Sequence, residues 1–224
     1  MEQRHADPAS LQARQKIDLE TWERRAQFEF FSRFTEPFHG VCVRVDCTET
    51  FRYAKQQELS VFLTLVHRSL AAANRIENLC LRIQGGSVWR YEQIHGSCAV
   101  GRPNGTIGFA YFPFRADIQE FVREASVAVE QVRLRNDIVR SEEVNLIRFS
   151  TLPWLDFTSL THARDLSLED SAPRITFGKI SEANDRRTMP VSIYVNHALA
   201  DGLHVGQFVE QLELLLREPD KTLD

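Results

Sequence analysis

The 224-residue sequence has little of several features that mark particular protein classes. It contains four cysteines and no C-x-x-C pair, so we expect neither a disulfide framework nor a zinc site, but reduced, buried thiols. Lys and Arg number 27 against 31 Asp and Glu, which argues against a nucleic-acid partner bound through phosphates. No apolar run approaches the roughly 20 residues of a membrane helix. These absences predict a cytoplasmic protein without metal, membrane or nucleic-acid partners.

The chain also lacks internal repeats, low-complexity tracts and any linker rich in Pro, Gly or Ser. Residues 1–15 are polar, without apolar periodicity, and do not resemble a signal peptide, which predicts a flexible N-terminal tail. Residues 16–224 are long enough to bury a hydrophobic core, so we expect one domain there. Fifteen phenylalanines indicate an aromatic core or pocket.

Apolar periodicity predicts how this domain is built. Helical spacing indicates a short helix from an Asp18 N-cap through Phe30, and further helices over 57–73, 117–133 and about 205–216. Alternation indicates strands over 41–47, 144–150, 174–180 and 191–195, with two short strands around 79–83 and 88–91. Residues 97–114 are compatible with strand or loop. Helices and strands do not alternate regularly, which favours an α+β fold: a two-layer sandwich of a mixed sheet with helices on one face.

One strand end stands out chemically. The two-residue period over 191–195 puts His197 at the next position on the apolar face, where another aliphatic side chain is expected. A buried histidine bonded to a backbone carbonyl is the simplest interpretation of such a residue. The alternative is a general base, because neutral imidazole accepts a proton near pH 7 and a strand end fixes its position. Asp201 and Gly202 follow as a tight turn, and the H-x-x-x-D-G spacing favours the second interpretation.

A wider resemblance supports that choice. Residues 196–206, NHALADGLHVG, resemble the H-H-A-x-x-D-G-x-H-V signature of the chloramphenicol acetyltransferase family. Three more blocks follow the family's order and spacing, namely KIDLETWERR at 16–25, STLPWLDFTS at 150–159 and APRITFGK at 172–179. The resemblance implies a fold shared with dihydrolipoyl acyltransferase cores. It also implies a homotrimer with active sites at subunit interfaces, acetyl-CoA as co-substrate without a permanently bound cofactor, and a small-molecule alcohol as acceptor.

The same resemblance implies roles for individual residues. His197 would be the general base, and Ser150 would donate a hydrogen bond to the oxyanion. Arg24 and Asp201 would form an ion pair that braces the site. The remaining matched positions are Thr176, Phe30, Phe31, Leu160 and His162 for substrate binding, and Lys179 and Trp154 for binding of the co-substrate.

Several positions depart from the family pattern. Asn196 replaces the first signature histidine, and Phe31 replaces a tyrosine that contacts the antibiotic. His162 makes an apolar position polar, Arg148 replaces a small polar residue on the strand face of the predicted serine, and Ile180 replaces an aromatic residue that can stack on adenine. These departures concern recognition and spare both catalytic residues.

We therefore predict an acetyl-CoA-dependent O-acetyltransferase. Its acceptor would be chloramphenicol or a related or different hydroxylated molecule. Two alternatives stay open at this point. One is an acyltransferase that uses another acyl donor or an amine or thiol acceptor, and the other is a non-catalytic trimeric ligand-binding protein.

Overall fold

The computed structural model describes residues 13–139, 141–220 and 223. In chain order these form β1 (Arg14–Lys16), α1 (Arg25–Phe31), β2 (Phe38–Asp46), α2 (Thr48–Gln56), α3 (Val61–Ala73), a short 3-10 turn (Glu77–Leu79), β3 (Leu81–Gln84), β4 (Ser87–Tyr91), β5 (His95–Gly101), β6 (Ile107–Phe112), α4 (Ile118–Arg133), β7 (Leu146–Thr151), β8 (Arg174–Phe177), β9 (Ser181–Ala183), β10 (Arg186–Asn196) and α5 (Gly202–Arg217).

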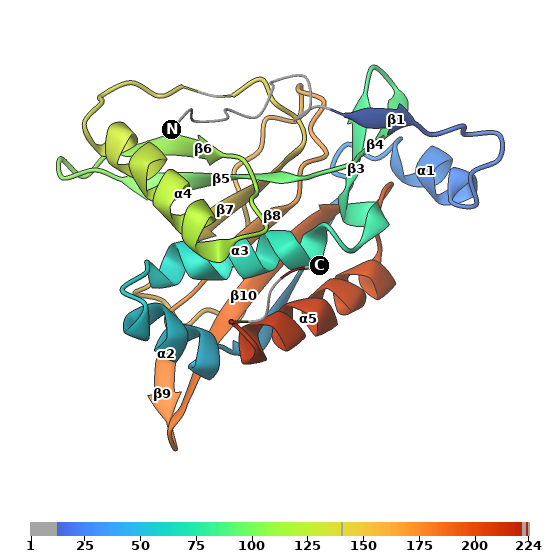
Figure 1. The fold of residues 1–224 in the computed structure, drawn as a ribbon. Coiled ribbons are helices and arrows are strands. Elements are labelled where there is room, and N and C mark those ends of the chain that lie inside the picture. Colours follow the sequence, from blue (N-terminus) through green and yellow to red (C-terminus); the bar gives the residue numbers. More distant parts are fainter. Residues whose placement is uncertain (1–12, 140, 221–222, 224) are drawn as a thin grey trace.

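A large mixed sheet forms the centre of the molecule, as the sequence predicts. Its strand order is β2-β10-β8-β7-β5-β6, and β9 pairs with the start of β10. Strand β7 runs parallel to both of its neighbours, β5 and β8, whereas the other pairs are antiparallel. A separate three-stranded sheet, in the order β1-β4-β3, lies beside α1 (Figure 1).

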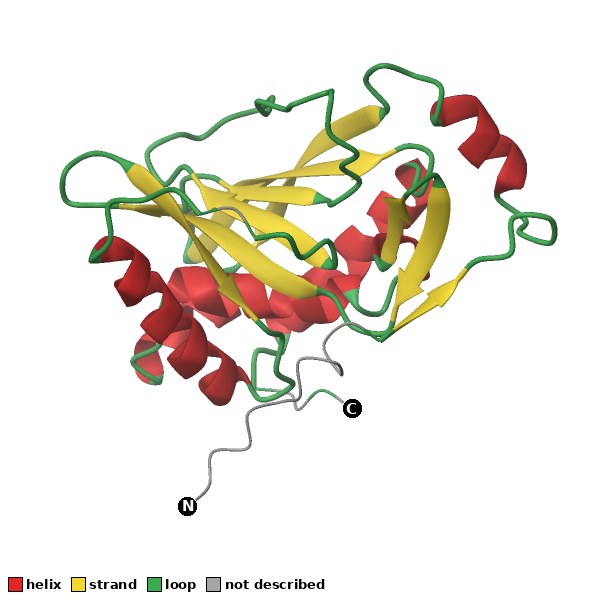
Figure 2. Ribbon diagram, turned by 90° about the horizontal axis from the view of Figure 1, so that it is seen from above, coloured by secondary structure: helices red, strands yellow, loops and turns green. Residues whose placement is uncertain are grey.

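Helices α2 to α5 gather on one side of the large sheet, and α1 lies apart from them (Figure 2). The buried side chains of β10 that face this side are Met189, Val191, Ile193 and Val195, and they share one hydrophobic cluster with Phe208 of α5. The alternate residues of β7, β8 and β10 point to the opposite face and are mostly polar. The sheet is therefore apolar toward the helices and polar on the other side.

The helix predicted over 57–73 is wrong at its start. Glu58 has a left-handed backbone, with φ of 55°, which a helix does not tolerate. Ser60 then caps α3 by accepting a hydrogen bond from the Leu63 N–H. The preceding helix, α2, was not predicted from the apolar pattern.

The N-terminal prediction also needs correction. Asp18 caps no helix, since its carboxylate accepts from the backbone of Glu20 and the hydroxyl of Thr21 in a turn, and α1 begins only at Arg25. Residues 1–12 of the predicted tail lie outside the described residues. Arg14 and Gln15, which were assigned to that tail, belong to β1, which pairs with β4.

Several predicted strands differ in extent from the observed ones; β2 begins earlier, at Phe38, and β10 runs over Arg186–Asn196. Residues 97–114 contain the hairpin of β5 and β6, which is joined through Gly105 with a φ of 82°. The strand expected over 174–180 ends at Phe177. Gly178 follows, and its backbone lies so close to Pro190 that a Cβ there would come within 2.4 Å of the proline ring.

Two further observations concern the described part of the chain. None of its helices combines the length and the apolar character needed to cross a membrane. Its four cysteines are free thiols, three of them buried, and burial raises the pKa of Cys47 and Cys98 to about 12.

One buried side chain of the small sheet makes four hydrogen bonds to backbone carbonyls, two of them beyond its own hairpin. The Arg82 guanidinium donates to the carbonyl oxygens of Leu79, Leu81, Val144 and Leu146 at 2.6–2.8 Å. Burial lowers its pKa to about 10, which still leaves it charged at neutral pH. Val144 and Leu146, just before and at the start of β7, are thereby tied to the hairpin of β3 and β4.

We expect Arg82→Leu to lower the free energy of unfolding by about 3 kcal/mol or more, because each buried carbonyl left without a donor costs roughly 1–3 kcal/mol. Urea denaturation measures this. The control is Arg90→Leu on the same hairpin, where the arginine is exposed and 3.7 Å from Glu77, a surface pair worth about 1 kcal/mol or less. Equal losses in the two variants would contradict the role given to Arg82.

Candidate active site

His197 lies in the turn that follows β10. Its N–H donates to the Pro37 carbonyl at 2.8 Å, which extends the pairing of β10 with β2 by one residue. Asn196 ends the strand, since its side-chain oxygen accepts from the Ala198 N–H at 3.0 Å and its carbonyl accepts from Leu199 and Ala200. The asparagine that replaces the first signature histidine is therefore the residue that shapes this turn.

The His197 ring is enclosed by two other rings. Phe31 of α1 stacks on it, with 3.8 Å between centroids and 7° between planes. His39 of β2 lies on it at 4.3 Å and 42°. Among the described residues, the Nδ1 atom of His197 is buried and has no hydrogen-bond partner. The ring is thus held in one plane, and Nε2 is the nitrogen that remains for a substrate.

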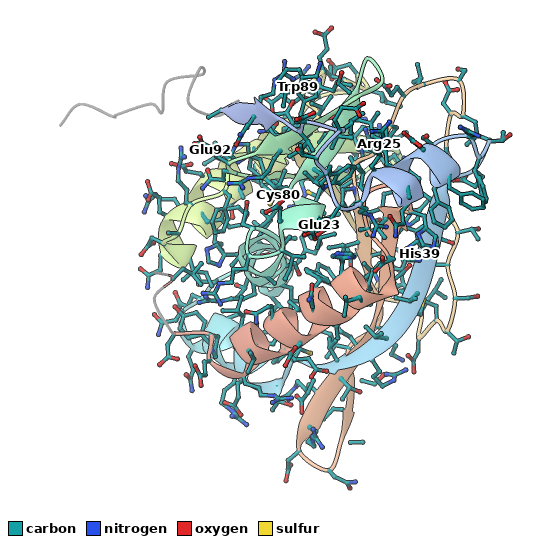
Figure 3. All side chains as sticks on the ribbon, turned by 90° about the vertical axis from the view of Figure 1, so that its right-hand side faces the viewer. Glu23, Arg25, His39, Cys80, Trp89 and Glu92 are labelled. Carbon is teal, nitrogen blue, oxygen red and sulfur yellow. The ribbon has the colours of Figure 1, made fainter. Side chains whose placement is uncertain are left out.

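Sequence reasoning missed His39. Its Nε2–H donates to the Ala200 carbonyl at 3.3 Å, so it links β2 to the turn that carries His197 (Figure 3). Burial and the neighbouring His197 lower the pKa of His39, which keeps it neutral at neutral pH. The strand predicted over 41–47 stops short of His39, whereas β2 begins at Phe38. The pairing of β2 with β10, which brings the two rings together, has no signal in the local sequence.

Arg24 connects the N-terminal segment to the histidine turn. Its Nη1 donates to the Asp201 carboxylate at 2.7 Å, and its Nη2 donates to the His197 carbonyl at 2.9 Å. Arg24 and Asp201 are the two residues that the family resemblance pairs. A second hydrophobic cluster supports the contact, because Phe28 of α1 packs with Ala198 and Leu199 of the turn.

Asp201 also caps α5. Its Oδ1 accepts from the Leu203 N–H at 3.1 Å and from His204 Nδ1 at 2.8 Å, both in the first turn of that helix. Burial alone would raise the pKa of Asp201. The hydrogen bond from Arg24 and the charge of His204 outweigh burial and lower this pKa to about 2. The carboxylate is therefore charged over the whole physiological range.

Four of the other predicted residues form a second group. Ser150 of β7 is the Cα partner of Thr176 of β8 in the parallel pair. Trp154 and Lys179 follow the carboxyl ends of these two strands, where the Leu155 carbonyl accepts from the Lys179 N–H at 2.8 Å. Trp154 is 78% exposed. Ser150 and Thr176 thus lie side by side near the carboxyl ends of β7 and β8. The two residues predicted to bind the co-substrate lie just beyond these strand ends.

The structure does not bring His197 to this second group within one chain. Ser150 pairs with Thr176, and Thr176 pairs with Ser192 of β10, five residues before His197. With about 3.3 Å per residue along a strand and about 4.8 Å between strands, His197 and Ser150 are about 20 Å apart. No single hydroxyl can touch both side chains in one copy of the chain.

The remaining predicted residues divide between the two groups. Phe30 is 59% exposed and contacts Phe31 and Phe34 with ring centroids 5.0 and 5.2 Å away, so it belongs to the histidine side. His162 packs edge-on against Tyr194 at 5.1 Å, on the polar face of the sheet. Leu160 is half-buried in the same loop.

Known structures share this arrangement of strands and helices. The cubic core of the pyruvate dehydrogenase multienzyme complex superposes with a TM-score of 0.64 over 88% of each chain, at 15% identity. A solved chloramphenicol acetyltransferase superposes with a TM-score of 0.85, at 29% identity, over 91% of this chain and all of that one. The fold is therefore that of the acyltransferases built on this mixed sheet.

Sequence comparison gives the family. The chloramphenicol acetyltransferase family model matches residues 13–213. Chloramphenicol acetyltransferases of Streptomyces acrimycini and Bacillus pumilus are 28% and 24% identical, over 91% and 92% of this chain and 94% of each relative. The chain belongs to the chloramphenicol acetyltransferase family, and it is an acyltransferase.

The low pKa of Asp201 predicts a specific pH dependence of stability. A carboxyl whose pKa falls from 3.8 to about 2 on folding contributes its full stabilisation above pH 4, and this contribution is lost as the pH falls toward 2. We expect the free energy of unfolding to drop more steeply between pH 4 and pH 2 in the native chain than in Asp201→Asn. Chemical denaturation across this range measures both slopes, and parallel slopes would contradict the assignment.

Proposed function

We propose that the protein is an acetyl-CoA-dependent O-acetyltransferase that transfers an acetyl group to a hydroxyl of a small molecule. The observation that carries the proposal is the state of His197: its ring is clamped by Phe31, its Nδ1 is enclosed, and its carbonyl is tied to Arg24. A packing histidine has no need of this fixation, whereas a general base gains rate from it. Membership of the family supports the same reaction.

In the proposed step, Nε2 of His197 takes the proton from the acceptor hydroxyl. The hydroxyl oxygen attacks the thioester carbonyl carbon, and the negative charge moves to the carbonyl oxygen. The Ser150 hydroxyl donates a hydrogen bond to this oxyanion, and Thr176 assists from the adjacent strand. When the oxyanion collapses, the C–S bond breaks and the imidazolium returns its proton to the CoA thiolate. No acyl-enzyme forms, because the thioester is already activated.

We infer that the site is completed by a second copy of the chain. The separation of about 20 Å between His197 and Ser150 supports this, since both groups must contact one substrate. Exposed aromatic side chains lie beside each group, namely Phe30 and Phe34 near His197, and Trp154 after β7. A second copy would cover these surfaces. The assembly we propose is a homotrimer of two-layer domains, with each site between two subunits.

Chloramphenicol is the first acceptor to test, because it is the substrate named for the relatives. A thiol-release assay with acetyl-CoA and a panel of alcohols, amines and thiols tests the reaction and the acceptor class, and longer acyl-CoAs test the donor. Consumption of acetyl-CoA with an alcohol in the panel supports the proposal. Saturable binding without any thioester consumption would overturn it.

We expect His197→Ala to lower kcat by about 10²–10⁴-fold or more, the range for loss of a positioned base. Ser150→Ala should lower kcat by about 10²-fold, the effect of losing one oxyanion donor. The control is Ser126→Ala on α4, which removes a hydroxyl from the other face of the sheet and should leave turnover unchanged. Thermal melts of all three variants show whether each remains folded, and a fully active His197→Ala would refute the mechanism.

A mixing experiment tests whether two chains build one site. When equal amounts of His197→Ala and Ser150→Ala are denatured together and refolded, we expect kcat to recover to about a quarter of the native value. In randomly assorted oligomers, about one site in four combines a native histidine with a native serine. If both residues acted within one chain, the mixture would be no more active than the average of its two parts.

A further inference from the structure

The face of the sheet that carries Ser150 also carries a group of arginines. In the pairing of β7 with β8, Arg148 is the Cα partner of Arg174, and Ser150 is the partner of Thr176. Positions two apart on a strand point to the same face and are separated by about 6.6 Å. The two arginines therefore form the row of side chains next to the two hydroxyls.

These arginines are not fully balanced by acidic residues. Asp170 accepts a hydrogen bond from Arg148 and from Arg174 on the same oxygen, at 2.7 Å each. Arg164 lies over the Phe38 ring at 3.6 Å and pairs with Glu36, whose side chain is 49% exposed. Two guanidinium groups, those of Arg148 and Arg174, thus share one carboxylate oxygen of Asp170, and these three side chains together carry a net positive charge.

Arg174 lies at the centre of the cluster. Its side chain is only 9% exposed, and its Nη1 is buried without a hydrogen-bond partner among the described residues. Thr176 Oγ1 and His162 Nε2 are also buried without a hydrogen-bond partner among the described residues. Burial and the charge of Arg174 lower the pKa of His162, so its ring is neutral. Buried polar groups are normally paired, and each one left unpaired costs free energy.

The cluster is open to a ligand at Arg148. Its side chain is 31% exposed, whereas Asp170, which holds it, is 7% exposed. A guanidinium held by one carboxylate oxygen keeps donors free for a second anion, and its planar geometry suits a carboxylate. Arg148 therefore presents a fixed, partly exposed cation on the same face of the sheet as Ser150, two residues away along β7.

Building on the proposed function, we propose that the acceptor of this enzyme is a hydroxy acid, whose carboxylate binds Arg148 beside the buried Arg174 while its hydroxyl lies at Ser150. The carboxylate supplies the negative charge that the cluster lacks. A neutral acceptor such as chloramphenicol leaves this positive charge without a partner, and sites built to bind a polar group reject analogues that lack it. The arginine row thus selects acceptors by charge.

The test uses two probes of the same shape, one anionic and one neutral, 4-(hydroxymethyl)benzoate and 4-(hydroxymethyl)benzamide. In each, one benzene ring separates the hydroxyl from the carboxylate or amide. We expect the native protein with CoA to bind the benzoate at least tenfold more tightly by calorimetry, and to acetylate it with a correspondingly higher kcat/KM. The preference should shrink as salt is raised, because salt screens partly exposed charges.

Arg148→Ser should reduce the preference to less than threefold, and Arg148→Lys should keep part of it. The matched control is Arg52→Ser, which removes one arginine from an exposed ion pair with Glu49 on α2, among the helices, and should keep the full preference. Circular dichroism melts show whether each variant folds. The comparison of the two probes on the native protein needs no variant.

The outcomes separate this inference from the proposed function. If neutral alcohols are acetylated but the benzoate neither binds better nor reacts faster than the amide, the hydroxy-acid proposal is wrong and the acetyltransferase stands. If no alcohol in any panel releases thiol, the proposed function fails, and calorimetry alone decides whether the arginine row binds a carboxylate. Equal binding of the two probes overturns the inference in either case.

Discussion

One guanidinium holds the histidine turn in place. Arg24 reaches across 177 positions of sequence to the Asp201 carboxylate and also binds the His197 carbonyl. Removing either partner of this mostly buried ion pair strands the other charge, which is why such contacts are hard to replace. Asp201 in turn caps α5, so the start of the last helix, the end of β10 and the segment before α1 share one set of hydrogen bonds. The plane of the imidazole depends on this set and on the Phe31 ring that α1 brings with it.

The direction of the strands divides the chemistry between two places. The parallel pair of β7 and β8 puts two hydroxyls side by side, with the predicted co-substrate residues just beyond the strand ends. Strand β10 is antiparallel to β8, so His197 lies beyond the amino end of β8, opposite to the co-substrate residues. His197 and the two hydroxyls therefore lie far apart within one chain, and exposed aromatic rings lie beside each of them.

One face of the sheet carries both the hydroxyls and the arginines, in separate rows. The hydroxyls of Ser150 and Thr176 occupy one row, and the guanidinium groups of Arg148 and Arg174 occupy the next. A substitution at one of the arginines changes the charge of this face without moving the hydroxyls of the neighbouring row. Substitutions at such positions allow a scaffold to retain its reaction while its acceptor changes. Asn196 shapes the histidine turn separately from this face, since its side-chain oxygen accepts a hydrogen bond from the Ala198 N–H.

Local sequence determined most of the strands and the two longest helices, because alternation and helical spacing reflect which face of each element is buried. It also determined His197 as a strand-end residue and, through short motifs, the family. It missed α2 and began the next helix too early, at 57, since no local pattern indicates the left-handed backbone of Glu58. The contact of His39 with His197, the bond of Arg24 to the His197 carbonyl, and the distance between the histidine and Ser150 were decided only by the tertiary structure. These depend on which strands pair and in which direction, and pairing is set by the packing of segments far apart in the chain rather than by either segment alone.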